Sequence, residues 1–337
     1  MNIREMTEEL ESKTLSPYAT LSSKSRGRQV PEEKCEVRTD FQRDRDRILH
    51  SKAFRRMKHK TQVFISPEGD HYRTRLTHTL EVSQIARTIS RALKLNEDLT
   101  EAIALGHDLG HTPFGHSGEY VLNRLMKEGF RHEEQSLRVV DVLERGSGLN
   151  LTWEVRDGIR NHNSRGNPAT LEGHVVKLAD WIAYINHDID DALRAGILKE
   201  KDLPSEPIKV LGKTHSQRID RMIKDIIRES YWKPYVRMSD EVYEATVELR
   251  SYLFERVYVG SSAKSQEIKA QKMLELLFEH FLKNVELMPE EFVAIAEREG
   301  IERGVCDYIA GMTDSFALHK FREIFVPFSW PIEKINF

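Results

Sequence analysis

Apolar residues recur at helical spacing along most of the chain, with successive apolar positions three or four residues apart. Such a period places the apolar side chains on one face of a helix, where they can pack against a core. Strand-like alternation is scarce, with one short candidate at 62–65. The pattern therefore predicts an all-α fold, built as a helical bundle with additional helices in its C-terminal part. Its clearest stripes are Val82, Ile85, Ile89 and Leu93; Leu137, Val140 and Leu143; and Val175, Leu178, Ile182, Ile185 and Ile189.

The pattern also divides the chain into three regions. Residues 1–40 are polar and rich in Ser, Lys and Glu, so we expect an N-terminal arm without a packed core of its own. Residues 41–203 form the predicted helical core, whose longest helix is expected at 171–193. A Pro-containing break marks its end, and 204–337 is predicted as a helical region that packs on the core. Further amphipathic helices are expected there, near 217–230, 240–257 and 266–286.

One predicted helix leads directly to the most unusual part of the sequence. Asn96 is a suitable N-cap, and Glu97 and Asp98 follow it as acidic residues in the first turn. The helix would run from there to His107 and Asp108. These two residues open a run of three histidines and one aspartate, interleaved with glycines, that ends at residue 116. Imidazole and carboxylate groups at this density are typical of a metal-centred hydrolytic site.

The composition excludes several classes of protein. The chain has 337 residues, with 51 basic and 54 acidic side chains and a net charge of −3, so it is not a polycation that coats nucleic acid. Its two cysteines, Cys35 and Cys306, lie far apart, which suits a reducing compartment rather than a disulfide framework. No apolar run is long enough to cross a membrane. We therefore expect a soluble, cytoplasmic protein without a membrane partner.

A hydrolytic metal site needs ligands that converge from several elements. His107 and Asp108 can supply two of them, and His78 qualifies as a third because it shares the inward stripe of its helix. Asp180 is the best downstream carboxylate, since it borders the apolar face of the 171–193 helix. A purely structural role stays open for His78 and for Asp180. An inward histidine is often a core residue whose hydrogen bonds are satisfied, and the acidic positions of 171–193 could form a solvated face.

The order His78, His107-Asp108 and Asp180 resembles that of the HD-domain phosphohydrolases. More narrowly, three segments look like the deoxynucleoside triphosphate triphosphohydrolases, the dGTPase-like family. The N-terminal stretches at 16–19 and 25–28 and the late motif at 307–314 are also similar to its bacterial members, so the resemblance spans nearly the whole chain. The three segments are 75–79, 107–116 and 180–184.

The resemblance implies a fold, a reaction and a set of residues. It implies an HD-domain bundle, the metal ligands His78, His107, Asp108 and Asp180, and one divalent ion, with Mn, Mg, Fe, Ni, Co and Zn all compatible with this ligand set. The implied reaction is hydrolysis of a deoxynucleoside triphosphate to the deoxynucleoside and tripolyphosphate. The leaving 5′-oxygen then needs a proton.

The resemblance further implies which side chains act on the substrate. His111 matches the general acid, Glu119 the carboxylate that orients and charges it, and His132 a further histidine near the triphosphate. His116 is expected to give a supporting hydrogen bond. Contacts with the triphosphate and the deoxyribose are expected from Gln62, Arg75, Tyr184 and Asp188. The resemblance also implies a homo-oligomer, whereas the preferred base does not follow from these residues.

A basic stretch leaves a second kind of partner open. Residues 38–75 contain eleven Lys or Arg against five Asp or Glu. Triphosphate capture, contact with single-stranded DNA, and a solvated face with salt bridges such as Asp44 to Arg47 are all compatible with it. The stretch has only four aromatic residues, which gives little support for base stacking. Competing functions are another HD-domain phosphohydrolase, namely a nucleotidase or phosphodiesterase, and a regulatory nucleotide-binding or DNA-binding protein with little turnover.

Overall fold

The computed structural model describes residues 1–62, 73–259 and 264–327. Within these residues, all elements of regular secondary structure are helices, joined by loops. The all-α prediction is confirmed. The only extended pairings in this part of the chain are two isolated bridges, Arg28 with Thr152 and Thr61 with Thr74. Of the strand candidate at 62–65, only Gln62 lies among the described residues. None of the described helices combines the length and apolarity that crossing a bilayer requires.

The first half of the chain contains α1 (Ile3–Thr14), α2 (Asp40–Leu49), α3 (Lys52–Arg56), α4 (Arg75–Leu93), α5 (Glu97–Gly106), α6 (His116–Leu125), α7 (His132–Arg138), α8 (Trp153–Asn161) and α9 (Leu171–Arg194). The second half contains α10 (Ser205–Leu211), α11 (His215–Ser230), α12 (Asp240–Leu253), α13 (Lys264–Lys283), α14 (Glu290–Glu299), α15 (Ile301–Ala310) and α16 (Asp314–Phe325). The helix predicted at 171–193 is thus α9, and those predicted near 217–230, 240–257 and 266–286 correspond to α11, α12 and α13.

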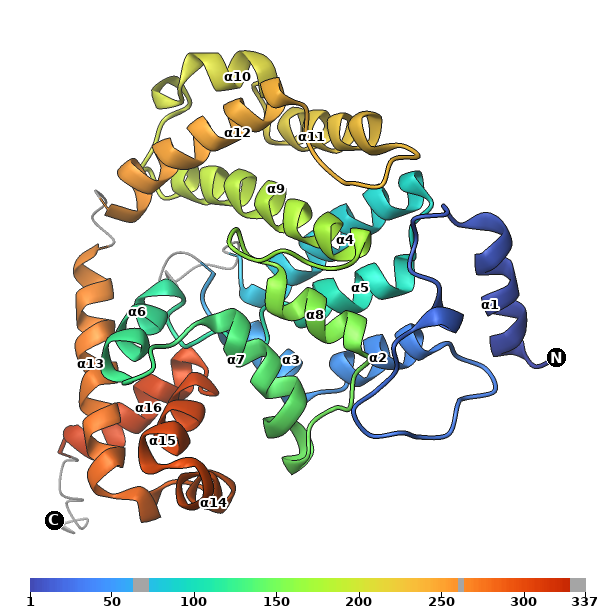
Figure 1. Cartoon of the computed structure of the whole chain (residues 1–337). Coiled ribbons are helices and arrows are strands. Elements are labelled where there is room, and N and C mark those ends of the chain that lie inside the picture. The colour runs from blue at the N-terminus through green and yellow to red at the C-terminus, as the bar shows by residue number, and fades with distance from the viewer. Residues whose placement is uncertain (63–72, 260–263, 328–337) are drawn as a thin grey trace, which may run out of the picture.

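Helix α9 lies at the centre of the larger part of the molecule. It packs against α4, α5 and α8 on one side and against α11 and α12 on the other (Figure 1). The stripe of α4 is fully buried in this packing, with Val82, Ile85 and Ile89 at most 2% exposed. Each such side chain contributes about 1.5–3 kcal/mol when it leaves water. The four helices α4, α5, α8 and α9 form a rigid frame whose ends carry the histidines discussed below.

A second core lies at the other end of the molecule. Helix α13 runs along one edge and packs against α6 and α15, and α14 and α16 complete the group (Figure 1). The apolar residues of α6, such as Val121 and Leu122, belong to this second core, whereas those of α11 and α12 belong to the first. The division expected at residue 204 therefore falls within the first core, and α6 packs with helices that follow it by more than 100 residues.

The N-terminal 40 residues are attached mainly by polar contacts. No apolar side chain of this segment is buried; the first in sequence is Phe41. Instead, buried carboxylates receive its backbone and hydroxyl groups: Glu172 of α9 accepts hydrogen bonds from the amide (3.0 Å) and hydroxyl (2.8 Å) of Thr20. Glu154 of α8 accepts one from the amide of Arg26 at 2.7 Å. The segment wraps around the frame without a core of its own, as its composition indicated.

Candidate metal and catalytic site

Four potential metal ligands converge from three helices of the frame. His78 lies in the first turn of α4, His107 and Asp108 directly follow the last residue of α5, and Asp180 lies within α9. The Nε2 atom of His78 is 3.1 Å from Oδ1 of Asp180, and Nε2 of His107 is 3.9 Å from the same oxygen and 3.6 Å from Oδ2 of Asp108. The structure thus brings together all four residues that the sequence singled out.

The histidines of this cluster are prepared to bind a cation. The Nδ1 atom of His107 donates to the carbonyl oxygen of Ala104 at 2.6 Å, so Nε2 is the ring nitrogen that lies near the two carboxylates. That Nε2 atom is buried and has no hydrogen-bond partner. Leaving such a buried polar atom unsatisfied costs about 1–3 kcal/mol, and its position among two carboxylates suits coordination of a cation. A divalent ion fits this set of two nitrogen and two oxygen donors.

The two carboxylates of the cluster are held in their ionised form. Burial opposes ionisation of Asp108, but the charges of His107 and Arg75 outweigh it and lower the pKa of Asp108 well below its usual range. Nη1 of Arg75 donates to Oδ2 of Asp108 at 2.6 Å. For Asp180, burial is likewise overcome, here by the hydrogen bond with His78 and the charge of His107, and its pKa is lowered. Ionised carboxylates are the form that coordinates metal ions.

A second cluster of titratable groups lies beside the first, centred on Glu119 in the first turn of α6. Its carboxylate accepts hydrogen bonds from the backbone amide and from Nδ1 of His132, both at 3.0 Å. Nε2 of His132 is 3.2 Å from Nε2 of His162, whose Nδ1 donates to the carbonyl oxygen of Ile159 at 2.7 Å. The Nε2 atom of His162 must therefore accept, and His132 donates from both nitrogens. The chain of bonds fixes His132 as an imidazolium ion.

The pKa of His132 agrees with this proton assignment. Burial disfavours its charged form, but the hydrogen bond and charge of Glu119 outweigh burial and raise the pKa of His132 to about 9. His162 behaves in the opposite way, because burial and the charges of His107 and His132 lower its pKa to about 4. No sequence pattern indicates a role for His162, since a single histidine at the end of a helix has no distinguishing pattern.

His111 lies near Glu119, since one ligating atom of each, together with one of His116, falls within 4.8 Å of the others, but it forms no hydrogen bond with that carboxylate. Its ring stacks on that of His132, with 4.6 Å between the centroids. Burial and the charges of Arg75 and His132 lower the pKa of His111 well below its usual range. The other imidazole beside Glu119 is His116, whose Nδ1 lies 3.5 Å from Oε2 and whose side chain is 73% exposed.

The residues expected to contact substrate surround these clusters. Arg75 begins α4 and, besides its bond to Asp108, donates to the backbone oxygen of Gln62 at 3.4 Å. Gln62 is buried and lies beside Arg75. Because Arg75 already holds a carboxylate ligand, its position can also influence the metal cluster.

Tyr184 and Asp188 follow Asp180 by one and two turns of α9. Burial, followed by the charges of Asp191 and Asp180, raises the pKa of Asp188 well above its usual range. The hydroxyl of Tyr184 interacts with Arg250 of α12, a residue that the sequence did not single out. A lone arginine on an amphipathic helix carries no local signal, since its placement depends on how α12 packs on α9.

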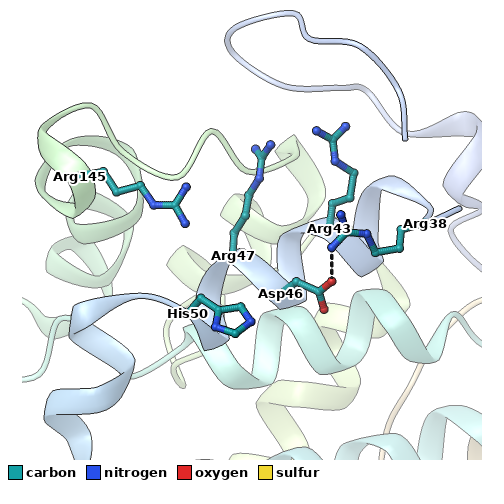
Figure 2. Close-up of a pocket in the computed structure, with 6 residues that line it drawn as sticks. All are labelled: Arg38, Arg43, Asp46, Arg47, His50 and Arg145. Carbon is teal, nitrogen blue, oxygen red and sulfur yellow. Dashed lines mark hydrogen bonds and ion pairs between the residues drawn. The ribbon is translucent and has the colours of Figure 1, made fainter. Parts of the chain in front are cut away.

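A separate basic pocket of about 220 Å³ lies at the end of α2 (Figure 2). It is lined by Arg38, Arg43, Asp46, Arg47, His50 and Arg145. Most of its arginines already hold carboxylates: Arg47 and Arg43 contact Glu32 at 2.7 and 3.2 Å, and Arg38 contacts Asp46 at 2.7 Å. Its positive charge is largely compensated within the protein.

The rest of the basic stretch is divided between salt bridges and the site. Asp44 forms its salt bridge with Arg28, not with Arg47 as the sequence suggested. Lys60 and Arg75, by contrast, reach the histidine cluster, where Lys60 donates to the backbone oxygen of His111. The basic stretch therefore includes a salt-bridged face on α2 and two basic residues, Lys60 and Arg75, at the candidate site.

Comparison with known proteins agrees with this geometry. An HD domain model matches residues 75–185, which include all four residues of the metal cluster, and a phosphohydrolase-associated domain model matches 236–323. A deoxyguanosinetriphosphate triphosphohydrolase-like protein of Caldanaerobacter subterraneus is 68% identical over 98% of both chains. The chain belongs to this family. Proteins of the same description from Desulfatibacillum aliphaticivorans and Clostridium perfringens are 51% and 52% identical, over 97% of this chain and 99% and 98% of theirs.

Membership of the dGTPase-like family confirms the resemblance seen in the sequence and the expected HD-domain fold. It also supports phosphohydrolase activity, because the HD domain model covers His78, His107 and Asp108, which form a cluster that could hold a metal ion, as well as the neighbouring Asp180. The phosphohydrolase-associated model covers α12 to α16, apart from the last residues of α16. Relatives of this family thus share both the frame and the second core.

Proposed function

We propose that this protein hydrolyses deoxynucleoside triphosphates to the deoxynucleoside and tripolyphosphate in a metal-dependent reaction. The observation that carries the proposal is the juxtaposition of a four-ligand cluster, with the unpartnered Nε2 of His107, and a cluster of histidines around Glu119. The first cluster can bind a metal ion, and the second can donate or accept a proton. The family membership supports the same substrate class, since the relatives are described as deoxyguanosinetriphosphate triphosphohydrolase-like.

The ion would be held by His78, His107, Asp108 and Asp180. A divalent ion bound there supplies Lewis acidity toward a phosphoryl oxygen and a water molecule. This set of ligands suits Mn, Mg, Fe, Ni, Co or Zn, and softness alone does not select among them. Arg75 lies against Asp108, where its guanidinium can also bind a phosphate oxygen.

The leaving 5′-oxygen of the deoxynucleoside needs a proton, and the contacts of Glu119 favour His116 as the donor. His116 is exposed and faces the carboxylate of Glu119, whereas His111 is buried, lacks a bond to that carboxylate and has a lowered pKa. We therefore assign proton donation to His116 in place of His111. His132, as a fixed imidazolium, stabilises the negative charge that develops on the phosphate, and His111 packs beneath it.

Three residues are assigned to the deoxyribose and its surroundings. Tyr184 packs against the sugar, where its ring would exclude a 2′-hydroxyl by sterics. Asp188, whose pKa is raised by burial, holds the 3′-hydroxyl of the sugar through a hydrogen bond. Gln62, which lies next to Arg75, is assigned to the surroundings of the sugar and base. We also propose a homo-oligomer, in keeping with the family resemblance, and a cytoplasmic location, which suits the free thiols of Cys35 and Cys306. We do not propose that the protein binds single-stranded DNA, because the arginines on and beside α2 already form salt bridges with carboxylates of the protein.

Product analysis tests the proposal directly. Purified protein is incubated with each of the four deoxynucleoside triphosphates in the presence of each divalent metal, and the products are separated by ion-exchange chromatography. Deoxynucleoside together with tripolyphosphate is expected. Pyrophosphate with monophosphate would contradict the reaction, and orthophosphate released from a monophosphate would indicate a nucleotidase. Turnover of cyclic nucleotides alone would indicate a phosphodiesterase.

A further inference from the structure

The motif at 307–314 lies outside both titratable clusters, yet its polar side chains bond to the segments that carry the catalytic histidines. It spans the end of α15 and the start of α16, in the second core. Asp314 is the first residue of α16 and Asp307 lies in the last turn of α15. Neither side chain belongs to the metal cluster or contacts Glu119.

Asp314 joins two segments of the site through one carboxylate. Its Oδ1 atom accepts a hydrogen bond from the backbone amide of Phe114 at 2.9 Å. Its Oδ2 atom accepts from the backbone amide of Thr61 at 2.9 Å and from the hydroxyl of Thr61. Phe114 lies in the turn between His111 and His116, with a φ of 59°, and Thr61 directly precedes the substrate-binding candidate at position 62. The Asp314 side chain therefore connects the turn that contains Phe114 with the segment that contains Thr61.

Lys60 makes a second connection between the same parts. Its side chain is 2% exposed, and Nζ donates to the backbone oxygen of Ala310 at 2.9 Å and to that of His111. Both acceptors are neutral carbonyl groups, and Ala310 is the last residue of α15. The backbone of His111 is thus fastened to the end of α15 through a single buried amine.

Asp307 makes a third connection, to the helix that begins with His132. It is fully buried and accepts hydrogen bonds from Nε of Arg138 at 2.8 Å and from Nε2 of Gln135 at 2.9 Å. Arg138 and Gln135 both belong to α7. Arg303 of α15 contacts the same carboxylate, so Asp307 is held from both helices. The position of α7 relative to α15, and hence that of His132, depends on this carboxylate.

We propose that the 307–314 motif positions the proton-transfer half of the site over the metal half, with Asp314 and Asp307 as positioning residues. The inference rests on the proposed function. It goes beyond it by assigning a role to the second core: the connections reach the 111–116 turn, Thr61 and α7. In the described part of the chain, none of the four metal-cluster side chains bonds directly to residues 307–314. Substitutions in the motif should therefore affect proton transfer and spare metal binding.

Asp314→Asn is the sharpest variant, because an amide can accept through only one oxygen while two backbone amides point at this side chain. We expect kcat to fall by about tenfold to a hundredfold, as for misplacement of catalytic groups by roughly 1 Å. KM and the bound metal measured by elemental analysis should stay within about twofold of the wild type. Asp240→Asn is the matched control, since Asp240 is also the first residue of a helix but is exposed and contacts neither turn.

Backbone amide exchange followed by NMR or mass spectrometry separates this inference from the proposed reaction. In Asp314→Asn, the amides of Phe114 and Thr61 should exchange about tenfold faster, because their acceptor is weakened. Exchange within α4 should not change, and Asp240→Asn should match the wild type throughout. If the wild type releases no tripolyphosphate from any deoxynucleoside triphosphate, the proposed function fails, but the exchange result still tests the connection.

Three results would overturn the positioning role. These are a kcat of Asp314→Asn within twofold of the wild type, a loss of metal parallel to the loss of activity, and unchanged exchange of the Phe114 amide. A uniform increase in exchange across α4 and α9 would also count against it, since that would indicate general destabilisation.

Discussion

The hydrogen bond between Glu119 and His132 offers the strongest test of the electrostatics at the site. In Glu119→Gln the side chain keeps its size but loses the charge that stabilises the imidazolium of His132. The carboxylate accepts from Nδ1 of His132 at 3.0 Å and is largely buried, with 19% of its side chain exposed. Once the charge of residue 119 is removed, the burial of His132 remains, and burial disfavours the protonated form of its ring.

The raised pKa determines the sign of the pH dependence. In the wild type, His132 titrates at about 9, above its ordinary value of 6.5. Its protonation therefore adds stability that is fully present below pH 6.5 and is lost as the pH rises to 9. The difference between these two pKa values corresponds to a contribution of about 3 kcal/mol to the free energy of unfolding. In Glu119→Gln, burial lowers the pKa of His132, so this contribution is absent and the variant is least stable at low pH.

Urea unfolding at several pH values between 6 and 9 measures the effect in metal-free protein. The difference in unfolding free energy between wild type and Glu119→Gln should be largest near pH 6 and should narrow by about 3 kcal/mol toward pH 9. The ring protons of His132, followed by NMR, should titrate near pH 9 in the wild type. A free-energy difference that does not vary with pH, or a wild-type His132 that titrates near 6.5, would refute the reasoning.

Three further predictions concern separate parts of the molecule. His116→Ala should lower kcat by about 10²–10⁴-fold with its metal retained, whereas His111→Ala should have a smaller effect; the opposite order in steady-state assays would return the donor role to His111. Asp108→Ala should lose both metal and turnover, as measured by elemental analysis beside activity, and full metal content would exclude it as a ligand. Glu172→Ala leaves buried donors of the N-terminal segment unpaired and should lower the unfolding free energy by about 2 kcal/mol, whereas the exposed Glu206→Ala should not.

The position of the four proposed metal ligands could be predicted because each lies on or shortly after a regular helix with a readable apolar face. His78 shares the stripe of α4, and Asp180 borders the stripe of α9. The N-cap Asn96 fixed the start of α5, and the helix ends one residue before His107. Where the helix period holds, the direction of a side chain follows from its position. Convergence of three helices on one point still required the resemblance or the structure.

The proton-transfer residues lie where the helix period no longer applies. Helix α5 ends at Gly106, so the four-residue interval from His107 to His111 does not place the two imidazoles on one helical face. Phe114 and Gly115 both have positive φ, at 59° and 57°, and this turn redirects the chain before α6 begins at His116. Such a reversal has no period that can be read from the sequence, so the sequence alone cannot place His111 and His116 relative to Glu119.

The position of His132 depends on a close approach between the backbone at Gly110 and the backbone of α7. In the sequence, the only sign of this approach is the glycine itself. A Cβ atom at Gly110 would lie 2.1 Å from the backbone nitrogen of Ser136 and 2.3 Å from the carbonyl carbon of Gln135, so no larger residue fits without moving α7. The amide of Gly110 donates to the hydroxyl of Ser136 at 2.9 Å. This contact sets α7 directly against the segment after α5, and the ring at the start of α7 then meets Glu119. Because the glycine specifies closeness but not the partner, the sequence could indicate that something packs there, and only the fold could identify it as α7.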